Sequence, residues 1–262
     1  QTGIPVDRIT LVDGDTDRVR TGGGTGGSRS LQLGGSAVRG ATELMVEQAK
    51  SIAARMLEAD EADIVLDKDN AAFHVAGTPA MSKSWAELAV ASKQQGDELT
   101  IDTLFVAEMA TFPFGAHIAV VEVDTGTGQV KHLRQVAVDD AGRVLNPLLL
   151  DGQIHGGIAQ GTAQALLEEV RYDEDGNPVT SNLADYAMIS AAELPSYEVI
   201  HMETPTPVNP LGAKGIGESG TIGSTPAVQS AVCDALSHVG VTHIDMPATS
   251  ERVWQAIQAA QQ

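Results

Sequence analysis

The chain has 262 residues, a formal net charge of −19 and a hydrophobic fraction of 42%, which together indicate an acidic globular protein rather than a disordered one. This length allows one large domain or two modest ones. The negative charge argues against nucleic acid or an anionic membrane as a partner, because both bind positively charged surfaces.

The single cysteine limits the chemistry further. Cys233 excludes an internal disulfide, and it excludes an iron–sulfur or zinc–thiolate cluster formed by this chain alone. It lies in Ala-Val-Cys-Asp-Ala, inside a helical pattern, which favours a buried small residue over a nucleophile.

The sequence gives little information on its cellular location. No uninterrupted apolar run reaches the roughly 18–20 residues that a membrane-spanning helix requires. The chain starts at Gln1, with neither an initiator methionine nor a signal pattern. We therefore expect an excerpt of a longer chain, with a cytoplasmic location as the default.

The first predicted elements are a strand and a turn. Arg8–Val12 is typical of a short strand, and Asp13–Asp17 of the turn that ends it. The run of aspartates suggests calcium, but the EF-hand loop also requires glycine at its sixth position and glutamate at its twelfth. Arg18 and Gly24 occupy those positions, so we expect no metal site there.

A glycine-rich segment, Thr21–Ser30, precedes a long helical pattern from about residue 31 to residue 58. A loop that leads into a helix in this way offers N–H groups to an anion. The alternative is a flexible linker, since Gly/Ser tracts often serve only as linkers. The glycine spacing fits no P-loop.

The middle of the chain combines strands and helices. Residues 64–103 are expected to form short strands and a helix over about Trp85–Lys93. Residues 116–124 and 130–138 flank a Thr-Gly-Thr-Gly turn, which predicts a hairpin. A helix should then open at Asn146-Pro147 and run to about Glu169. Its many glycines, which cost roughly 1 kcal/mol each in a helix, indicate close packing against backbone or a ligand.

The last part contains a second glycine-dense loop. A hairpin is predicted at Asp175-Gly176, and a proline-rich stretch follows from residue 195 to 210. Gly212–Gly223 then holds five glycines around one acid, Glu218, before helices predicted from about residue 224 and from about residue 249. In a dry pocket this carboxylate would become a tuned acid or base, whereas an exposed one is only solvated. The whole pattern predicts an α+β fold with mixed sheets and helices.

Three motifs in this order resemble the molybdenum hydroxylases, the family of xanthine dehydrogenase, aldehyde oxidase and aerobic carbon monoxide dehydrogenase. The motifs are Thr25-Gly-Gly-Ser-Arg-Ser30, Asn146-Pro with Gly152-Gln-x-x-Gly-Gly-x-x-Gln-Gly161, and Gly212-Ala-Lys-Gly-Ile-Gly-Glu218. The likeness is to the C-terminal part of the large, cofactor-binding subunit and covers nearly the whole chain. It implies the fold of the second molybdenum-cofactor-binding domain. Residues 1–262 would be a C-terminal portion of that domain, divided into two interleaved subdomains of about 1–110 and 111–262.

The resemblance also implies roles for individual residues. Glu218 would be the catalytic base beside molybdenum, which lowers the pKa of a bound water. The expected contacts of molybdopterin, either alone or as a dinucleotide, are Thr25, Gly26, Gly27, Ser28, Ser30, Gln160, Lys214, Gly215 and Gly217. No residue of this chain is expected to ligate the metal.

Each of these roles has a simpler alternative. Gln160 would otherwise be a helix-surface amide, and Glu218 a solvated loop acid. Lys214 is either a phosphate contact or an ordinary loop charge. His155 and His117 are better explained as structural histidines than as ligands.

The chain departs from the family pattern in two respects. The family's Gly-Gln-Gly segment and its whole first cofactor-binding half are absent from this sequence, and Ser219 stands where many relatives have proline. The resemblance therefore implies partners: the N-terminal half of the large subunit, with iron–sulfur clusters and FAD on other chains or domains. The chain would be either a subunit of a split enzyme or a fragment.

The leading functional hypothesis is an oxidoreductase part that acts on an aldehyde, an N-heteroaromatic ring or a similar small substrate, with water as the oxygen source. One alternative is a non-catalytic fragment or interaction module that retains the fold. Another is a phosphate-ligand binding protein that uses its glycine-rich loops. No nucleic-acid or membrane partner is expected.

Overall fold

The computed structural model describes residues 1–19 and 21–261. It contains helices and two three-stranded sheets, which confirms the predicted α+β class. The described residues form two compact units. The first unit holds residues 1–25 and 30–108, and the second holds residues 26–29 and 109–262. Their correspondence to two subdomains of one cofactor-binding domain stays a prediction.

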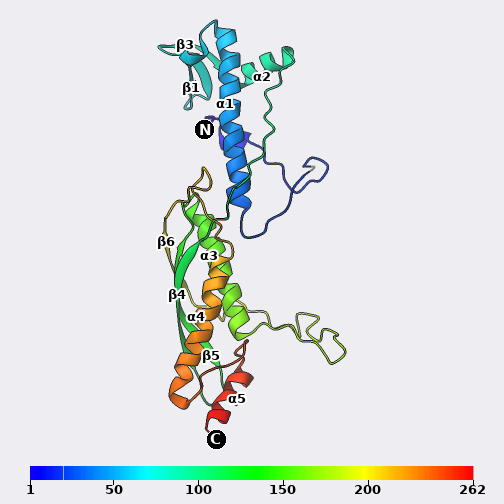
Figure 1. The fold of residues 1–262 in the computed structure, drawn as a ribbon, viewed down its shortest axis with the longest axis vertical. Helices are drawn as coiled ribbons and strands as arrows, with labels where there is room; N and C mark the ends of the chain where they lie inside the picture. The colour runs from blue at the N-terminus through cyan, green and yellow to red at the C-terminus, as the bar shows by residue number, and fades with distance from the viewer. Residues whose placement is uncertain (20, 262) are drawn as a thin grey trace. The chain divides into compact units, whose positions relative to one another are not determined.

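The first unit is built on one long helix and a small antiparallel sheet (Figure 1). A π-helical turn, Leu31–Gly35, leads into α1, Ser36–Leu57. The sheet has the order β1-β2-β3, with bounds Ile64–Asp67, Ala72–Val75 and Thr78–Ser84. Helix α2, Trp85–Gln94, starts at a capping box between Ser84 and Glu87. The core of this unit includes Ala49, Ile52, Ala53, Leu57, Ile64, Phe73 and Leu88.

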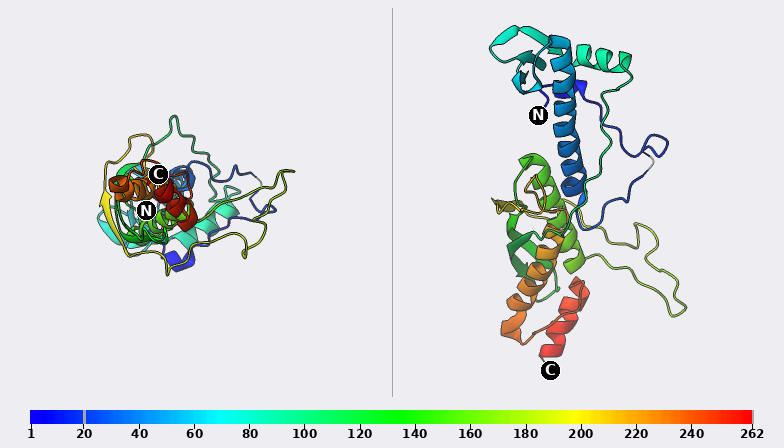
Figure 2. Two further views of the ribbon diagram at one scale, coloured as in Figure 1. Left: turned by 90° about the horizontal axis from the view of Figure 1, so that it is seen from below. Right: turned by 45° about the horizontal axis from the view of Figure 1, so that its top comes forward.

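The second unit packs two helices on one face of a mixed sheet (Figures 1 and 2). The sheet has the order β4-β5-β6, and β5 pairs antiparallel with β4 and parallel with β6. Strands β4, β5 and β6 span Phe114–Val123, Val130–Asp140 and Tyr197–Met202. Helices α3, α4 and α5 span Pro147–Leu166, Ser219–Leu236 and Ser250–Ala260. A parallel pair needs a crossover connection, and the segment containing α3 provides it between β5 and β6.

The glycines within α3 and α4 bring the two helices into backbone contact. A Cβ on Gly157 would lie 2.9 Å from Gly220 Cα, and a Cβ on Gly220 would lie 2.6 Å from the Ile154 carbonyl oxygen. A Cβ on Gly161 would lie 2.9 Å from the Thr221 carbonyl oxygen. No side chain fits at these three positions. Close packing against backbone therefore accounts for these three costly glycines.

Most predicted elements are present, and the misses have physical causes. The strand predicted at Arg8–Val12 is wrong: Val6–Arg8 form a short 3₁₀ turn, and exposed Ile9 and Leu11 pair with no strand among the described residues. The hairpin at Asp175-Gly176 reduces to one isolated bridge between Tyr172 and Pro178. Strand β6 was not predicted, because it lies within the proline-rich stretch of residues 195–210.

Helix α4 begins at Ser219, directly after Glu218 and earlier than predicted. Gly220 and Gly223 resemble loop residues in the sequence, but they lie inside the first turns of this helix. Glu218 is therefore at the N-terminus of a helix, not in the middle of a loop. Within the part of the chain that the structure describes, no helix has the length and apolar character needed to span a membrane.

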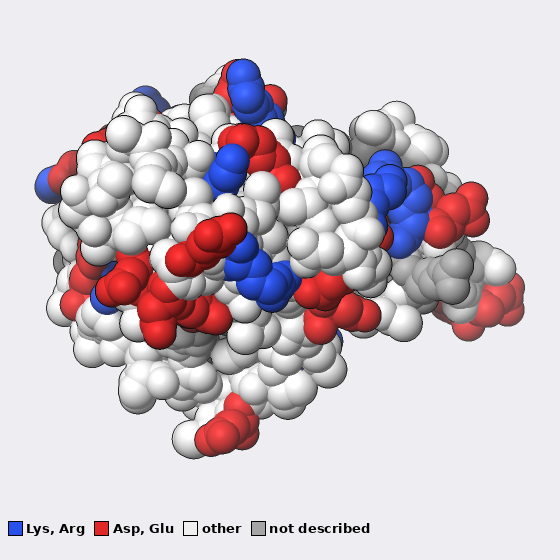
Figure 3. Space-filling view, turned by 90° about the horizontal axis from the view of Figure 1, so that it is seen from above, with Lys and Arg blue, Asp and Glu red and all other residues white. Residues whose placement is uncertain are grey.

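Charged side chains are distributed without a large basic region on the face drawn in Figure 3. On that face, the described Lys and Arg residues lie next to Asp and Glu and form no continuous positive surface.

Candidate functional site

The structure brings the two glycine-rich loops together at Glu218. Ser28 lies in the short segment 26–29 that belongs to the second unit. Its Oγ donates a hydrogen bond to Glu218 Oε2 at 3.1 Å. Ser28 has a φ of 54°, in the left-handed region, and the preceding Gly27 has a φ of 62°. Two consecutive left-handed residues turn the chain sharply, so this backbone places the Ser28 hydroxyl against the carboxylate.

Gly217 is the point where a third segment joins the two loops. A Cβ on Gly217 would lie 3.1 Å from Ser28 Oγ and 3.1 Å from Gln153 Oε1. The missing side chain therefore lets Ser28, the first turns of α3 and the Glu218 loop converge. Gln153 was not predicted as a site residue, although it lies within the glycine-rich motif of α3. The i, i+7 spacing of Gln153 and Gln160 on one helix face is the sequence signal that points to it.

Gln160 lies further along the same helix and contacts α4. The single hydrogen of Thr221 Oγ1 is shared between Gln160 Oε1 at 3.3 Å and the Gly157 carbonyl oxygen at 3.0 Å. The Gln160 side chain is exposed. Its oxygen is thus fixed by α4, while its amide nitrogen has no hydrogen-bond partner among the described residues. The Gln160 amide can donate to a ligand placed at this face.

The backbone of the Glu218 loop is held by pairing with the end of β5. Lys214 N donates to the Ala141 carbonyl oxygen and Arg143 N donates to the Gly212 carbonyl oxygen, each at 2.8 Å. Gly212 has a φ of 69°, which favours glycine at this turn. The Asn209 side chain adds a hydrogen bond to the Ala213 carbonyl oxygen at 2.8 Å. The loop is therefore anchored before it reaches Glu218.

Lys214 has a partner other than a ligand. Its Nζ lies 2.9 Å from Asp140 Oδ1 and 4.6 Å from the centroid of the Phe114 ring. The Lys214 side chain is 8% exposed and that of Asp140 is 0% exposed. Burial alone would raise the pKa of Asp140, but hydrogen bonds from Thr204, Lys214 and Gly142 lower it to about 2. This ion pair helps to fix the loop, and a contact of Lys214 with a phosphate stays a prediction.

The remaining predicted contacts lie in less constrained surroundings. The hydroxyls of Thr25 and Ser30 hydrogen-bond to each other across the turn of their loop. Gly26 is exposed, and a Cβ at Gly26 or Gly27 would meet no atom within 4 Å. Gly215 is buried within the anchored loop. A role for these residues in cofactor binding stays a prediction.

Glu218 itself is exposed, as the residue that precedes the first turn of α4. The first N–H groups of a helix have no intrahelical acceptor, and the helix dipole favours negative charge at this end. The described residues do not form a water-excluding pocket around the Glu218 carboxylate, which was one of the two alternatives drawn from the sequence. Glu218 is instead an accessible carboxylate with one hydroxyl donor beside it.

A buried polar cluster lies beneath this helix terminus. Asp139 is 2% exposed, and its Oδ2 lies 3.0 Å from His117 Nε2. Its Oδ1 accepts a hydrogen bond from Ser219 Oγ at 2.5 Å. His117 is thus a structural histidine, as the sequence indicated, but its partner Asp139 was not identified.

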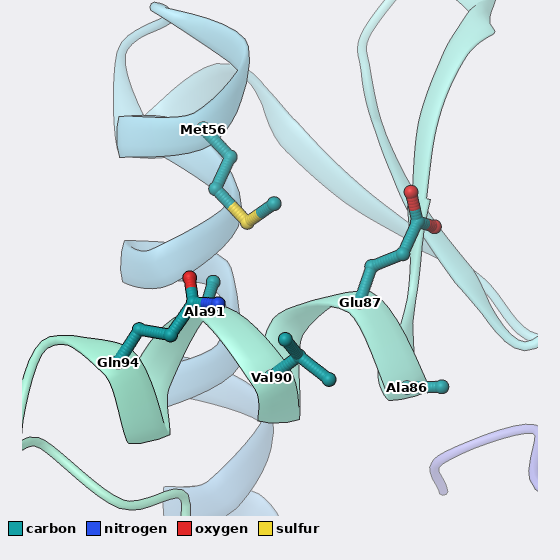
Figure 4. A pocket seen from close by; sticks show the side chains of 6 residues that line it. All are labelled: Met56, Ala86, Glu87, Val90, Ala91 and Gln94. Atoms are coloured by element: carbon teal, nitrogen blue, oxygen red, sulfur yellow. The ribbon is translucent and has the colours of Figure 1, made fainter.

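The grooves of the first unit contain none of the predicted site residues. One of about 390 Å³ lies between α1 and α2 and is bordered by Met56 and Val90 (Figure 4). Glu87 also lines it, but its carboxylate is engaged in the cap of α2. The lining therefore brings together no set of polar groups suited to catalysis.

The Ser28 hydroxyl at Glu218, the N-terminus of α4 and the Gln153 amide beside Gly217 define a site that can hold an organic cofactor by hydrogen bonds. The profile of a known family, the molybdopterin cofactor-binding domain, matches residues 1–195. The chain belongs to this family. The family match ends before the Glu218 loop, but full-length alignments to relatives include that loop.

The relatives are large subunits of redox enzymes. The chain is 40% identical over 262 residues to the carbon monoxide dehydrogenase large chain of Hydrogenophaga pseudoflava, which is 98% of this chain and 32% of that protein. It is 36% identical over 262 residues to the nicotine 6-hydroxylase large subunit of Paenarthrobacter nicotinovorans, which is 97% of this chain and 32% of that protein. The chain therefore spans about a third of the length of these relatives.

Solved structures show the same fold. The crystal structure of a Cu,Mo-containing CO dehydrogenase in its carbon monoxide reduced state superposes with a TM-score of 0.86 at 37% identity. That match covers 98% of this chain and 33% of the other. Quinoline 2-oxidoreductase from Pseudomonas putida 86 gives a TM-score of 0.75 at 36% identity, over 89% of this chain and 30% of the other. The resemblance to the molybdenum hydroxylases is confirmed.

Proposed function

We propose that this chain forms one side of the molybdopterin site of a molybdenum hydroxylase and supplies its general base, Glu218. The observations that carry this proposal are the hydrogen bond from Ser28 to the Glu218 carboxylate and the approach of Ser28 and Gln153 to Gly217, the residue before Glu218. These residues come from three distant segments of the chain, each of which contains a glycine-rich motif.

The residues present fit a cofactor held through its organic part. At the N-terminus of α4, the site offers hydroxyl and amide donors and a space at Gly217 that any side chain would fill. Such groups bind the pterin and phosphate of a cofactor. Among the described residues, no three His, Cys, Asp or Glu side chains are grouped to hold a metal ion. Lys214 supports the loop through Asp140 in this proposal, and its remaining N–H donors can contact the phosphate.

When bound, the molybdenum cofactor supplies a two-electron acceptor and activates the water-derived oxygen that is added to the substrate. Glu218 accepts the proton that this activation releases, since it is the carboxylate at the centre of the site. Ser28 orients the carboxylate through the 3.1 Å hydrogen bond. Gln160 and Gln153 donate to the cofactor from one face of α3.

The substrate we propose is a small molecule with an electron-poor carbon: an N-heteroaromatic ring, an aldehyde or carbon monoxide. The names of the relatives support the ring and carbon monoxide as substrates, since they include a nicotine hydroxylase and carbon monoxide dehydrogenases. The complete enzyme would contain the rest of the large subunit, which closes the site, and iron–sulfur and flavin subunits, which remove the electrons.

The test is the Glu218→Gln variant of the enzyme that contains this chain, purified with its molybdenum. Loss of a general base reduces turnover by about 10²–10⁴-fold, while the molybdenum content should match that of the unmodified enzyme. Glu122→Gln, at an exposed position on β4, is the matched control and should retain activity. Full turnover in Glu218→Gln would contradict the proposal. Loss of molybdenum would assign Glu218 a structural role instead.

A further inference from the structure

The first turn of α4 is attached to the sheet by a buried carboxylate that the proposed reaction does not use. Asp139 is the penultimate residue of β5. One of its oxygens accepts the Ser219 hydroxyl at 2.5 Å, and the other lies 3.0 Å from His117 Nε2 on β4. Ser219 is the residue next to Glu218 and the first residue of α4.

Two glycines make room for this arrangement. A Cβ on Gly115 would lie 2.6 Å from Asp139 Oδ1, and a Cβ on Gly223 would lie 2.6 Å from the His117 ring. A side chain at either position would displace one member of the pair. The sequence thus provides space for Asp139 on the strand side and for His117 on the helix side.

The carboxylate has the partners that a buried charge requires. Burial alone would raise the pKa of Asp139, but hydrogen bonds from His117 and Ser219, with smaller charge interactions with His117 and His201, hold it below its ordinary value. Gln135 Nε2 lies 3.5 Å from His117 Nδ1, and His132 Nε2 lies 3.1 Å from Gln135 Oε1. These contacts with Gln135 and Asp139 fix the His117 ring. Because an unpaired buried charge is costly, the Asp139 carboxylate in turn stays beside this ring.

Glu218 depends on its neighbours for its orientation. Its exposed carboxylate has one hydrogen bond to a described residue, that from Ser28. The Glu218 carbonyl oxygen accepts the Ile222 N–H at 3.0 Å, and the next residue, Ser219, has a buried side-chain partner.

We propose that Asp139, held by His117, is a positioning residue for Glu218 and acts through the hydroxyl of Ser219. This inference rests on the proposed role of Glu218 as the base. Without the Ser219–Asp139 hydrogen bond, the first turn of α4 would loosen, and both the carboxylate and the helix N–H groups would leave their places at the cofactor.

The primary variant is Ser219→Ala in the full enzyme. Asp139→Ala is less suitable, because it would leave two buried partners unpaired and risks unfolding. Ser219→Ala removes only the hydroxyl, since the Ser219 N–H keeps its hydrogen bond to the Ile216 carbonyl oxygen at 3.1 Å. Ser224→Ala is the matched control: Ser224 is buried in the same helix, but its hydroxyl donates to the Ile158 carbonyl oxygen of α3.

Two measurements distinguish positioning from a general loss of stability. Hydrogen exchange of residues 216–224, followed by mass spectrometry, should become faster in Ser219→Ala than in Ser224→Ala. A displacement of about 1 Å can reduce a rate by about a hundredfold, so kcat should fall by about ten- to a hundredfold in Ser219→Ala. KM and molybdenum content should stay unchanged. Equal exchange and equal kcat in the two alanine variants would overturn the proposal.

Double variants test whether Asp139 acts on Glu218 through the Ser219 hydroxyl. Ser219→Ala should cause no further loss of kcat in the Glu218→Gln background, and Asp139→Asn should cause little further loss in the Ser219→Ala background, since groups that act through one another are not additive. Multiplicative losses would contradict the inference. If Glu218→Gln alone retained turnover, the proposed function would fail, whereas the exchange comparison would still test the positioning.

Discussion

Two regions around Glu218 differ in how closely their atoms pack. The support is the contact of α3 with α4 together with the Lys214–Asp140 pair, and the open face is the side of α3 that carries Gly152 and Gly156. In the support, α3 and α4 touch at Gly157 and Gly220, and the Lys214–Asp140 pair is buried. On the open face, a Cβ at Gly152 or Gly156 would meet no atom within 4 Å. The chain therefore uses glycine in two ways within the same helix. In the support, glycine lets backbones pack, and on the open face it leaves space that only a bound molecule or another part of the protein can use.

The largest expected effect on stability is that of Asp140→Asn in the support. This change leaves the Lys214 ammonium buried without its charged partner, and breaking a buried ion pair costs about 3–5 kcal/mol. Denaturant unfolding of the variant and the unmodified protein measures the difference. A loss below about 1 kcal/mol would show that solvent reaches Lys214.

The same pair should make the support sensitive to acid. The pKa of Asp140 is lowered from 3.8 to about 2 in the folded protein. A lowered carboxyl pKa stabilises the fold above the unfolded value, and this contribution is lost as the pH falls from about 4 through about 2. The shift corresponds to about 2 kcal/mol. Stability measured between pH 5 and pH 2 should fall less steeply in Asp140→Asn, and equal slopes would contradict this assignment.

Gly220→Ala should be the next most damaging change. The new methyl group would meet the Ile154 carbonyl oxygen at 2.6 Å, and overpacking of this kind costs about 1–3 kcal/mol. Thermal unfolding provides the measurement. An unchanged midpoint would show that α3 and α4 can separate without loss.

Gly152→Ala, on the open face, should stabilise the fold, whereas Gly220→Ala should destabilise it. Alanine is favoured over glycine in a helix by about 0.5–1 kcal/mol, and here it would meet no neighbour within 4 Å. The stability of the chain should therefore rise slightly, while molybdenum incorporation into the enzyme should fall if this face lies against the cofactor. Unchanged molybdenum content would place the cofactor away from Gly152.

The sequence predicted local features of the site better than long-range ones. Glu218, Ser28 and Gln160 lie within glycine-rich motifs that can be recognised along the chain, and helix α3 begins at Asn146-Pro147 as expected. Asp139 was missed because its role depends on the pairing of β4 with β5, which places Gly115 opposite Asp139. Such pairing is not visible in the local pattern of either strand.

The elements that were predicted wrongly also depend on non-local contacts. β6 is stabilised by parallel pairing with β5, a non-local contact that outweighs its proline-rich flanks. The early start of α4 depends on contacts of Gly220 with α3. Conversely, Ile9 and Leu11 have strand-like residues but no neighbouring strand to pair with among the described residues.

The most direct test of the central claim is to locate molybdenum by anomalous diffraction in crystals of the enzyme that contains this chain. We predict one molybdenum peak beside the Glu218 carboxylate, with the cofactor's pterin along Ser28, Gln153 and Gln160. A molybdenum peak remote from Glu218, or a cofactor that contacts none of these side chains, would contradict it.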